Sequence, residues 1–479
     1  MNESCARRGH LLGVSPLAAC LLLSMNTPGI GSTPTEPSLH AEPLARQFLG
    51  STWVGTEAAH FSSDIALRVA KPRSKPAGAL LVTNCDDAGP GSLRDTVAGA
   101  ISGDTIDLTQ LPCSTITLTS GAIPVLQDDL ALAGPGAGSL AINGGDAFSI
   151  LRHAGAGTLS VDGVTLTHGY FHQYYGHGGC VFSPGNVALY DSVVSNCVVR
   201  GGYARGGGIF AVHDLTLVNT LVTGNLADGG DLTSSGGGFL VGGYLLVQNS
   251  TISNNIALTT PAPNGKFSVG GAADTFGDVV IEGSTISGNQ AKNVAGPVFE
   301  AHGTPTAVMI DSTVSGNIAT DHGPFGGVYS GIPLSIYNST IAFNTGTGVS
   351  GLVSAYPIVL QSTIIADNVP RDFRLYTGGS VTGSNNLITI ASVVPPDTIR
   401  DCARLGPLAD NGGTTLTHPL LHASPALDTG NDTIGVDNDQ RGPGFPRVVG
   451  ANADIGAFEW QGEADDELFL SRFEVGCDH

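Results

Sequence analysis

The chain has 479 residues, of which 68 are glycine, 13% are charged and 41% are hydrophobic. This share of apolar residues is enough to build a core, which argues against a disordered, glycine-rich chain. The net charge is −21, from 41 acidic and 20 basic residues, and no basic stripe is present. The composition therefore excludes the electrostatic footprint of a nucleic-acid-binding protein.

Residues 1–31 are typical of a signal peptide. Arg7 and Arg8 precede an apolar stretch, 11–23, that is too short to span a bilayer. The segment Leu17–Cys20 resembles a lipobox, but the apolar run continues beyond its cysteine. Lipidation of that cysteine and ordinary cleavage therefore stay open as alternatives. We expect an exported protein, secreted or held at the cell surface, without a transmembrane span.

Residues 32–78 are rich in Pro, Ser, Thr and Ala, and we interpret them as a flexible linker. Of the eight cysteines, two lie in the signal peptide, and the even number that is left indicates disulfides in an exported chain. We favour a bond between Cys85 and Cys113. No spacing of Cys or His is typical of a metal site, so we expect no cofactor.

One short helix is predicted where the β region begins, near residue 79. Ser92 and Asp95 have the spacing of a capping box, with Ser92 as the N-cap. Leu93 and Val97 then fall on one helical face. We expect this amphipathic helix to cap the first coil of the fold that follows.

Copies of a seven-residue motif follow at intervals of 24 to 34 residues, and the segment Asn249 to Asn255, NSTISNN, is one of the fullest. The fourth position is apolar in each copy and is predicted to stack in the core. Asparagine at the seventh position tolerates a left-handed backbone, and its amide can donate to and accept from the next copy. The predicted ladder residues are Asn225, Asn255, Asn289, Asn317, Asn344 and Asn368.

A second marker, two or three glycines followed by apolar residues, recurs in step with the first, as at Gly206–Phe210. A further short strand, such as Leu215–Val218, lies between the two markers. One unit of three short strands cannot bury its own face, but stacked units can. The sequence therefore predicts an all-β fold, a parallel β-helix of about ten coils over residues 79–400. The helix caps one end, and an irregular segment, 401–461, caps the other.

The two markers resemble the repeats of bacterial polymorphic outer-membrane proteins, which are surface right-handed β-helices. Residues 84–95 resemble the opening segment of secreted β-helix proteins of the CSLREA type. Together with the crossover rule, these resemblances imply a right-handed, exported solenoid, but no reaction. No autotransporter barrel follows, and the tail, 462–479, leaves the anchoring open. Four segments resemble the choice-of-anchor Q region: 405–413, 424–430, 439–442 and 454–459.

An enzymatic alternative is a polysaccharide lyase or glycoside hydrolase that acts on an acidic polysaccharide. Gly176-His177-Gly178 resembles a short motif of polygalacturonases, but the further motifs of those enzymes are missing. A glycoside hydrolase needs two carboxylates across one bond, and the sequence does not place such a pair. A lyase needs a base, and after residue 78 Lys266 and Lys292 are the lysines present.

The acidic residues near the C-terminus are predicted to be structural. Asp437-Asn438-Asp439 has oxygen ligands of the kind that Ca²⁺ takes, but a solvated turn explains the same residues. Asp439, Arg441, Asp454 and Glu459 are predicted to form a polar network within the terminal cap.

The most informative candidate site is a row of loops between the seventh position and the next glycine marker. Stacking is predicted to bring these loops to one edge of the solenoid. Flat aromatic rings beside hydrogen-bond donors are typical of glycan-binding and protein-binding surfaces. Ordinary exposed loops of uneven length are the alternative. The candidate ligand-binding residues are Tyr170, His172, Tyr174, Tyr175, His177, Arg200, Tyr203 and Arg205.

The sequence thus favours an exported, monomeric scaffold that binds a glycan or a surface protein through this strip. No catalytic site is recognisable from the sequence, so the enzymatic reading is kept as the alternative.

Overall fold

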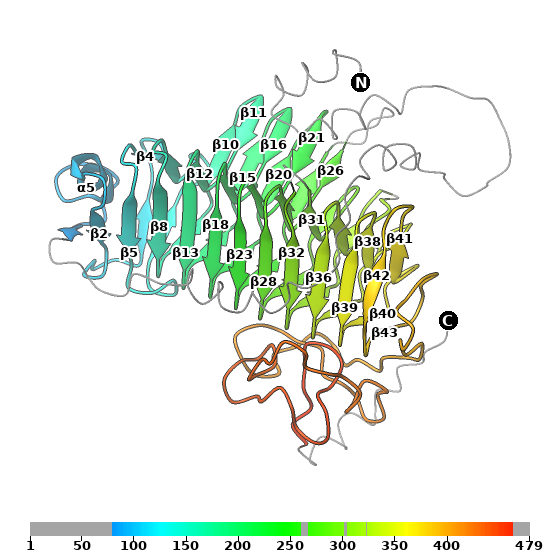
Figure 1. The fold of residues 1–479 in the computed structure, drawn as a ribbon. Helices are drawn as coiled ribbons and strands as arrows, with labels where there is room; N and C mark the ends of the chain where they lie inside the picture. Colours follow the sequence, from blue (N-terminus) through cyan, green and yellow to red (C-terminus); the bar gives the residue numbers. More distant parts are fainter. Residues whose placement is uncertain (1–78, 260–266, 301–303, 322, 463–479) are drawn as a thin grey trace, which may run out of the picture.

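The computed structural model describes residues 79–259, 267–300, 304–321 and 323–462, which form a right-handed parallel β-helix (Figure 1). Three sheets run along the solenoid, with 12, 11 and 10 parallel strands, and we call them sheets 1, 2 and 3. The predicted signal peptide and linker lie outside the described residues, as does the tail beyond residue 462. No helix among the described residues is long and apolar enough to cross a membrane.

The strands are short, and each pairs with its counterpart in the next coil. Sheet 1 contains β1 (Leu80–Leu81), β2 (Thr105–Asp107), β5 (Leu130–Ala133), β8 (Thr158–Asp162), β13 (Asn186–Tyr190), β18 (Leu215–Val218), β23 (Leu245–Gln248), β28 (Val279–Glu282), β32 (Ala307–Ile310), β36 (Leu334–Tyr337), β39 (Ile358–Gln361) and β42 (Val381–Ser384). Sheet 2 contains β3 (Thr115–Thr117), β6 (Ala141–Asn143), β9 (Thr165–Thr167), β14 (Val193–Ser195), β19 (Leu221–Thr223), β24 (Thr251–Ser253), β29 (Thr285–Ser287), β33 (Thr313–Ser315), β37 (Thr340–Ala342), β40 (Ile364–Ala366) and β43 (Leu387–Ile388). Sheet 3 contains β4 (Ile123–Val125), β7 (Leu151–His153), β12 (Val181–Ser183), β17 (Ile209–Ala211), β22 (Phe239–Val241), β27 (Ala273–Thr275), β31 (Pro297–Phe299), β35 (Val328–Ser330), β38 (Leu352–Ser354) and β41 (Phe373–Leu375).

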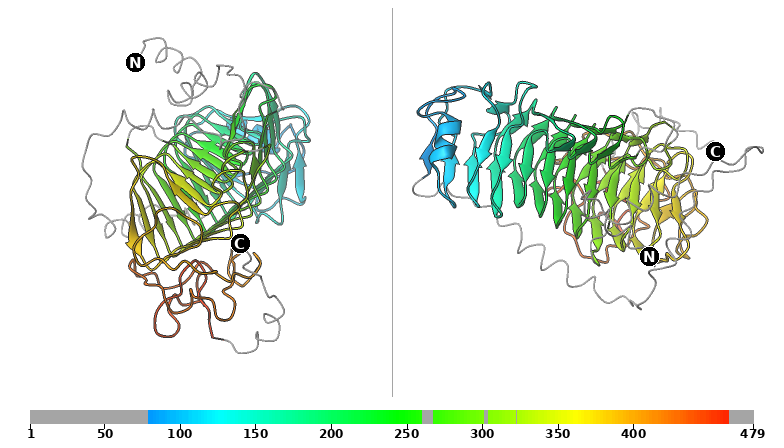
Figure 2. Two further views of the ribbon diagram at one scale, coloured as in Figure 1. Left: turned by 90° about the vertical axis from the view of Figure 1, so that its right-hand side faces the viewer. Right: turned by 90° about the horizontal axis from the view of Figure 1, so that it is seen from above.

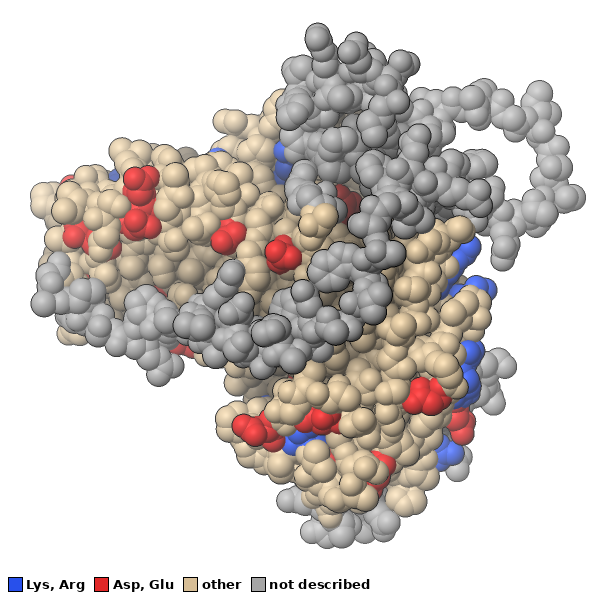
Figure 3. All heavy atoms as spheres, in the orientation of Figure 1, with Lys and Arg blue, Asp and Glu red and all other residues tan. Residues whose placement is uncertain are grey.

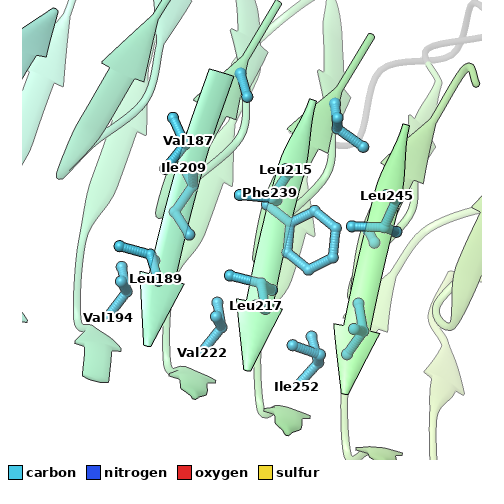
Figure 4. Close-up of a cluster of buried hydrophobic side chains, with 14 of the residues drawn as sticks. Val187, Leu189, Val194, Ile209, Leu215, Leu217, Val222, Phe239, Leu245 and Ile252 are labelled. Carbon is cyan, nitrogen blue, oxygen red and sulfur yellow. The ribbon is translucent and has the colours of Figure 1, made fainter. Parts of the chain in front are cut away.

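The core is a set of apolar rows that run along the solenoid axis. Val194, Val222 and Ile252 occupy the fourth position of successive motifs, pair in register and are fully buried. Figure 4 shows their side chains pointing into the same interior as Leu189 and Leu217. Full burial of one such side chain contributes roughly 1.5–3 kcal/mol, so the repeated motif stabilises each coil in the same way.

The bends between strands use a left-handed backbone, but not at the position expected. In the motif 249–255, positive φ angles fall on Asn249 (48°) and Asn254 (55°), the first and sixth positions. None of the six ladder asparagines has a positive φ. The prediction that the seventh position adopts this conformation is therefore wrong. Asn, Asp and Gly occur at the sixth position because they adopt a left-handed backbone at low cost.

The six seventh-position asparagines form a continuous row of hydrogen bonds. The Nδ2 of Asn255 donates to Asn289 Oδ1 (3.0 Å) and to the Val222 carbonyl (2.9 Å). Its Oδ1 accepts from the side chain (2.9 Å) and the backbone N–H (3.0 Å) of Asn225. Since Asn255 is fully buried, these bonds offset the cost of removing its amide from water.

The row ends in groups that complete its hydrogen bonding. At one end the backbone N–H of Cys197 donates to Asn225 Oδ1 (3.0 Å). At the other end Asn368 Nδ2 donates to the carboxylate of Asp372 (3.0 Å). Burial raises the pKa of Asp372, and the bonds from Asn368 oppose that shift. The ladder therefore runs along the buried bends that follow sheet 2, and each of its six side-chain amides is hydrogen-bonded.

Two disulfides are present among the described residues. Cys85 is bonded to Cys113, as predicted, and this bond ties the segment after β1 to the segment before β3. Cys180 is bonded to Cys197, the residue that begins the ladder. Each bond restricts the unfolded chain and is expected to contribute roughly 3 kcal/mol.

The helix α5 (Leu93–Gly99) lies at the N-terminal end of the coils (Figures 1 and 2). Its Ser92 side chain accepts from the Asp95 N–H, as the capping box predicts. Leu93 and Val97 are buried in the main core, so the helix covers the open face of the first coil.

The C-terminal segment, 401–461, does not cap the far end of the solenoid as expected. It lies along the outer face of sheet 2, beside the last coils (Figure 1). The hydroxyl group of Thr285 in β29 donates a hydrogen bond to the Leu416 carbonyl. The hydroxyl group of Ser315 in β33 is hydrogen-bonded to the ring of His418 (2.8 Å). The outward-facing hydroxyl groups of sheet 2 thus provide the partners that dock this segment against its flank.

Buried charge and apolar contacts complete this docking. Arg447, which is 1% exposed in its side chain, lies 3.8 Å from Asp311 and 3.8 Å from Glu459. A second apolar cluster joins Ala342 and Ile364 of sheet 2 to residues of the segment. The net charge is dispersed on the face drawn in Figure 3, where acidic side chains lie singly or in small groups.

The ladder predicts that Asn255→Asp destabilises the protein by about 3 kcal/mol, because a buried carboxylate cannot donate to Val222 or Asn289. Thermal unfolding followed by circular dichroism measures the effect. Asn254→Asp is the matched control, since Asn254 is exposed and has a φ that Asp tolerates. Equal melting temperatures for the two variants would contradict the ladder.

Candidate functional site

Between sheets 2 and 3 the chain leaves the coil and returns, and the excursions form two further sheets, which we call the fin (Figure 1). Sheet 4 contains β10 (Tyr170–His172), β15 (Val198–Arg200), β20 (Leu226–Asp228), β25 (Ile256–Leu258), β30 (Gln290–Ala291) and β34 (Ile318–Ala319). Sheet 5 contains β11 (Tyr175–His177), β16 (Tyr203–Arg205), β21 (Thr233–Ser235) and β26 (Ser268–Val269). The predicted row of loops is therefore a row of paired strands.

The fin has its own small interior. Val199 and Ala227 of sheet 4 and Ala204 of sheet 5 are buried together, and Phe171 packs against them. Successive side chains of a strand point to opposite faces, so the neighbours of these residues point outward. A side chain on Gly176 would collide with Val199, which explains glycine at that inward position.

The eight predicted ligand-binding residues consequently do not form one strip. Tyr170, His172 and Arg200 lie on the outer face of sheet 4. Tyr175, His177, Tyr203 and Arg205 lie on the outer face of sheet 5, and Tyr174 is in the turn between β10 and β11. Sequence reasoning missed this division because it treated the excursions as loops, to which strand alternation does not apply.

Three tyrosines gather on the sheet 5 side of the fin. The rings of Tyr175 and Tyr203 are stacked, 5.2 Å apart and inclined by 15°. Tyr174 meets both rings edge-on, at 4.9 Å and 5.6 Å. Tyr174 and Tyr175 are 59% and 41% exposed, which is unusual for large rings in mutual contact. The cluster presents flat apolar area and phenol hydroxyl groups to solvent.

The foot of sheet 5 leans over the outer face of sheet 3. The His177 ring lies 5.9 Å from Phe182 and 5.0 Å from Phe210, both on sheet 3. Burial, and then the charges of Arg205 and Arg152, lower the pKa of His177 to about 4. His177 is therefore a neutral ring at physiological pH and supplies packing rather than charge.

A pocket of about 340 Å³ lies at the N-terminal edge of the fin, and Arg152 of β7 lines it together with Tyr170 and His172. The guanidinium lies over the ring of Phe171 (4.1 Å) and donates to the His177 carbonyl (2.7 Å). Burial lowers the pKa of Arg152 to about 10. The pocket is also lined by Phe171, so it lies where the interior of the fin meets its first strand.

Two carboxyl groups that the sequence did not single out lie on the outer face of sheet 3. Asp274, in the middle of β27, is 2% exposed and is hydrogen-bonded to Ser235 of the fin. Glu300 directly follows β31, and its backbone N–H donates to the Thr275 carbonyl (2.8 Å), which continues the strand pairing. Tyr329 pairs with Val298 on the next strand of this face.

Both carboxyl groups have raised pKa values, and the charge of Asp274 contributes to the shift at Glu300. Burial raises the pKa of Asp274 to about 7, while the bond from Ser235 and the charge of Arg205 oppose the shift. Burial, and then the charge of Asp274, raise the pKa of Glu300 to about 8. Shifts of this size at a surface that also carries aromatic rings are typical of functional sites. The sequence did not single out Asp274 and Glu300 because each is a single acidic residue within or next to an apolar strand.

The weak calcium prediction does not agree with the surroundings of Asp439. Its carboxylate accepts from Arg441 (2.7 Å) and from the Glu459 N–H (2.8 Å). The Glu459 carboxylate accepts in turn from the Asp454 N–H (2.7 Å). These residues form the predicted polar network, and within the described ranges no group of three metal-binding side chains is present.

Comparisons with known proteins place the chain in no family. No family model matches it, and no curated protein matches its sequence. Among solved structures, the crystal structure of pectate lyase Pel9A is similar, with a TM-score of 0.42 and 15% sequence identity. The alignment covers 80% of this chain and 97% of that chain. A similarity this low carries no argument about substrate or activity, so function has to be argued from the residues above.

The raised pKa of Glu300 predicts a pH dependence of stability. A carboxyl group whose pKa is raised in the folded state stabilises the folded protein at pH values below its unfolded pKa of about 4.3. For Glu300, this stabilisation is lost as the pH rises through about 8. The melting temperature should therefore fall between about pH 5 and about pH 9, and Glu300→Gln should flatten the fall.

Asp146→Asn, at an exposed turn residue, is the control and should keep the wild-type slope. Parallel slopes for the wild-type protein and Glu300→Gln would contradict the raised pKa of Glu300.

Proposed function

We propose that the protein is an exported glycan-binding protein whose binding surface is the sheet 5 side of the fin. The observation that carries this proposal is the exposed cluster of Tyr174, Tyr175 and Tyr203. Sugar rings have apolar faces edged by hydroxyl groups, and they bind to flat aromatic rings flanked by hydrogen-bonding side chains.

Polar groups beside the cluster suit this ligand class. Tyr203 and Arg205 lie on the same face of β16, two residues apart. Burial, then the neighbouring Tyr174 and Tyr175, raise the pKa of Tyr203, so its hydroxyl group stays protonated and can donate or accept. Arg205 adds a guanidinium that can bind hydroxyl or carboxylate oxygens of a sugar.

Preorganisation supports binding at this surface. The tyrosine rings are borne by paired strands whose register is fixed by the coils below, with Tyr175 directly opposite Tyr203. Little side-chain entropy is then lost when a ligand binds to rings that already contact each other. The two disulfides suit an extracellular protein, and the resemblance to exported surface β-helix proteins supports the same location.

The binding surface predicts that Tyr175→Ala and Tyr203→Ala each weaken glycan affinity by about tenfold or more, because each removes one stacked ring. A glycan array identifies the ligand, and isothermal titration calorimetry then compares the variants with the wild-type protein.

The opposite face provides a matched control. Tyr170→Ala removes a tyrosine from sheet 4, and Trp460→Ala removes an exposed ring far from the fin. Both variants should bind as the wild-type protein does. Loss of binding in Tyr170→Ala with normal binding in Tyr175→Ala would overturn the assignment to sheet 5.

A further inference from the structure

We propose that the pocket at the N-terminal edge of the fin binds a small organic acid that carries a ring, and that Arg152 pairs with the carboxylate of this acid. The pocket has a volume of about 340 Å³, at the lower end of the range for small-molecule sites. Tyr174, Tyr175 and Tyr203 do not line it. The inference therefore goes beyond the proposed glycan-binding function, and the two can fail separately.

The pocket exists because the fin begins abruptly along the solenoid. Sheet 4 starts at β10 and sheet 5 at β11, whereas β6 and β7 of the preceding coil are joined by residues 144–150 with no strand between them. The N–H of Tyr170 donates to the Phe148 carbonyl (3.0 Å), which holds the first strand of the fin against this shorter connection. The ring of Phe171, which packs against the interior of the fin, therefore lines a pocket instead of being covered by a further strand.

The guanidinium of Arg152 is fixed in position, and one of its edges is free to bind a ligand. It lies over the ring of Phe171 (4.1 Å) and over the ring of Phe182 (4.4 Å). Its Nη1 donates to the His177 carbonyl (2.7 Å). Within the described ranges, Nε and Nη2 of this residue donate to no group. These two atoms form an edge of the guanidinium that can donate to both oxygens of one carboxylate.

Arg152 also lacks a counter-charge. None of the ion pairs in the described part of the chain includes it. Burial lowers the pKa of Arg152 to about 10, and no acidic neighbour opposes the shift. The guanidinium is therefore still charged at physiological pH, and a half-buried charge without a partner costs stability. A bound carboxylate would offset that cost, so the pocket favours an anion although the chain as a whole has a net charge of −21.

The other residues of the pocket indicate what the acid carries besides its carboxylate. Tyr170 and His172 line the pocket with their rings 6.4 Å apart. The Tyr170 hydroxyl group and the His172 ring nitrogens form no hydrogen bond with the described residues, so they are available as further donors. Much of the remaining wall is apolar and suits a ring, since it consists of Ala122, Ala147 and Phe148.

Isothermal titration calorimetry with two matched pairs of probes tests the proposal. Benzoate is compared with benzamide, and D-galacturonate with D-galactose, so that each pair differs in the charged carboxylate. We expect the wild-type protein to bind at least one acid about tenfold or more tightly than its neutral partner, because only the acid pairs with Arg152. The acid that binds more tightly shows whether the ring is aromatic or a sugar.

Three variants locate the bound acid. Arg152→Lys keeps the charge but loses the planar fork, and we expect about tenfold weaker binding. Tyr170→Phe removes one hydroxyl group that has no partner in the described structure, so affinity should fall about threefold or more while the melting temperature stays unchanged. Arg374→Lys is the matched control, because Arg374 of β41 on sheet 3 also lies over an aromatic ring, that of Tyr376 (4.9 Å), and does not line the pocket. It should keep the wild-type affinity.

Melting temperatures are measured on the same samples. Weaker binding in Arg152→Lys and Tyr170→Phe, with a normal melting temperature in Tyr170→Phe, supports the proposal. Equal affinities within both probe pairs overturn it, as does the absence of binding at acid concentrations up to ~10 mM. Binding that survives both substitutions also overturns it, even if Arg152→Lys melts at a lower temperature, because Arg152 would then only hold the fin against sheet 3. Failure of the glycan array contradicts the proposed function alone.

Discussion

The buried asparagine ladder is the constraint on which the rest of the structure depends. Each amide must meet the amides of the coils before and after it, so the coils that carry Asn225 to Asn368 are held in register with one another. A slip by one residue would expose the apolar row and leave the amides without partners. Because the register is fixed, outward side chains that are far apart in the sequence fall into straight rows on the surface.

The outer surfaces of the fin and of sheet 3 are both built from such rows of side chains. Tyr175 is placed opposite Tyr203 by the coil spacing, and the same spacing brings Asp274 near Glu300. The interior of the fin consists of Val199, Ala204 and Ala227, with Phe171 packed against them. The fin is therefore thin, and its two outer faces carry different side chains. Aromatic rings, the guanidinium of Arg205 and two carboxyl groups with raised pKa values thereby lie on one side of the molecule.

The sequence predicts the repeated part of this structure and not its exceptions. The ladder follows from a column pattern that recurs along the chain, and the bond between Cys85 and Cys113 was favoured from the even number of cysteines in an exported chain. The pairing of Asp274 with Glu300 depends on register across coils, and nothing in either local sequence marks it. The docking of 401–461 on sheet 2 depends on contacts such as Thr285 with Leu416, more than a hundred residues apart, which no repeat encodes.

The central claim is that the sheet 5 side of the fin is a glycan-binding surface. The crystal structure of the protein with a bound oligosaccharide tests it most directly. The account predicts a sugar ring stacked on Tyr175 and Tyr203. An oligosaccharide in the pocket beside Arg152, at the N-terminal edge of the fin, with the tyrosine cluster unoccupied, would contradict it.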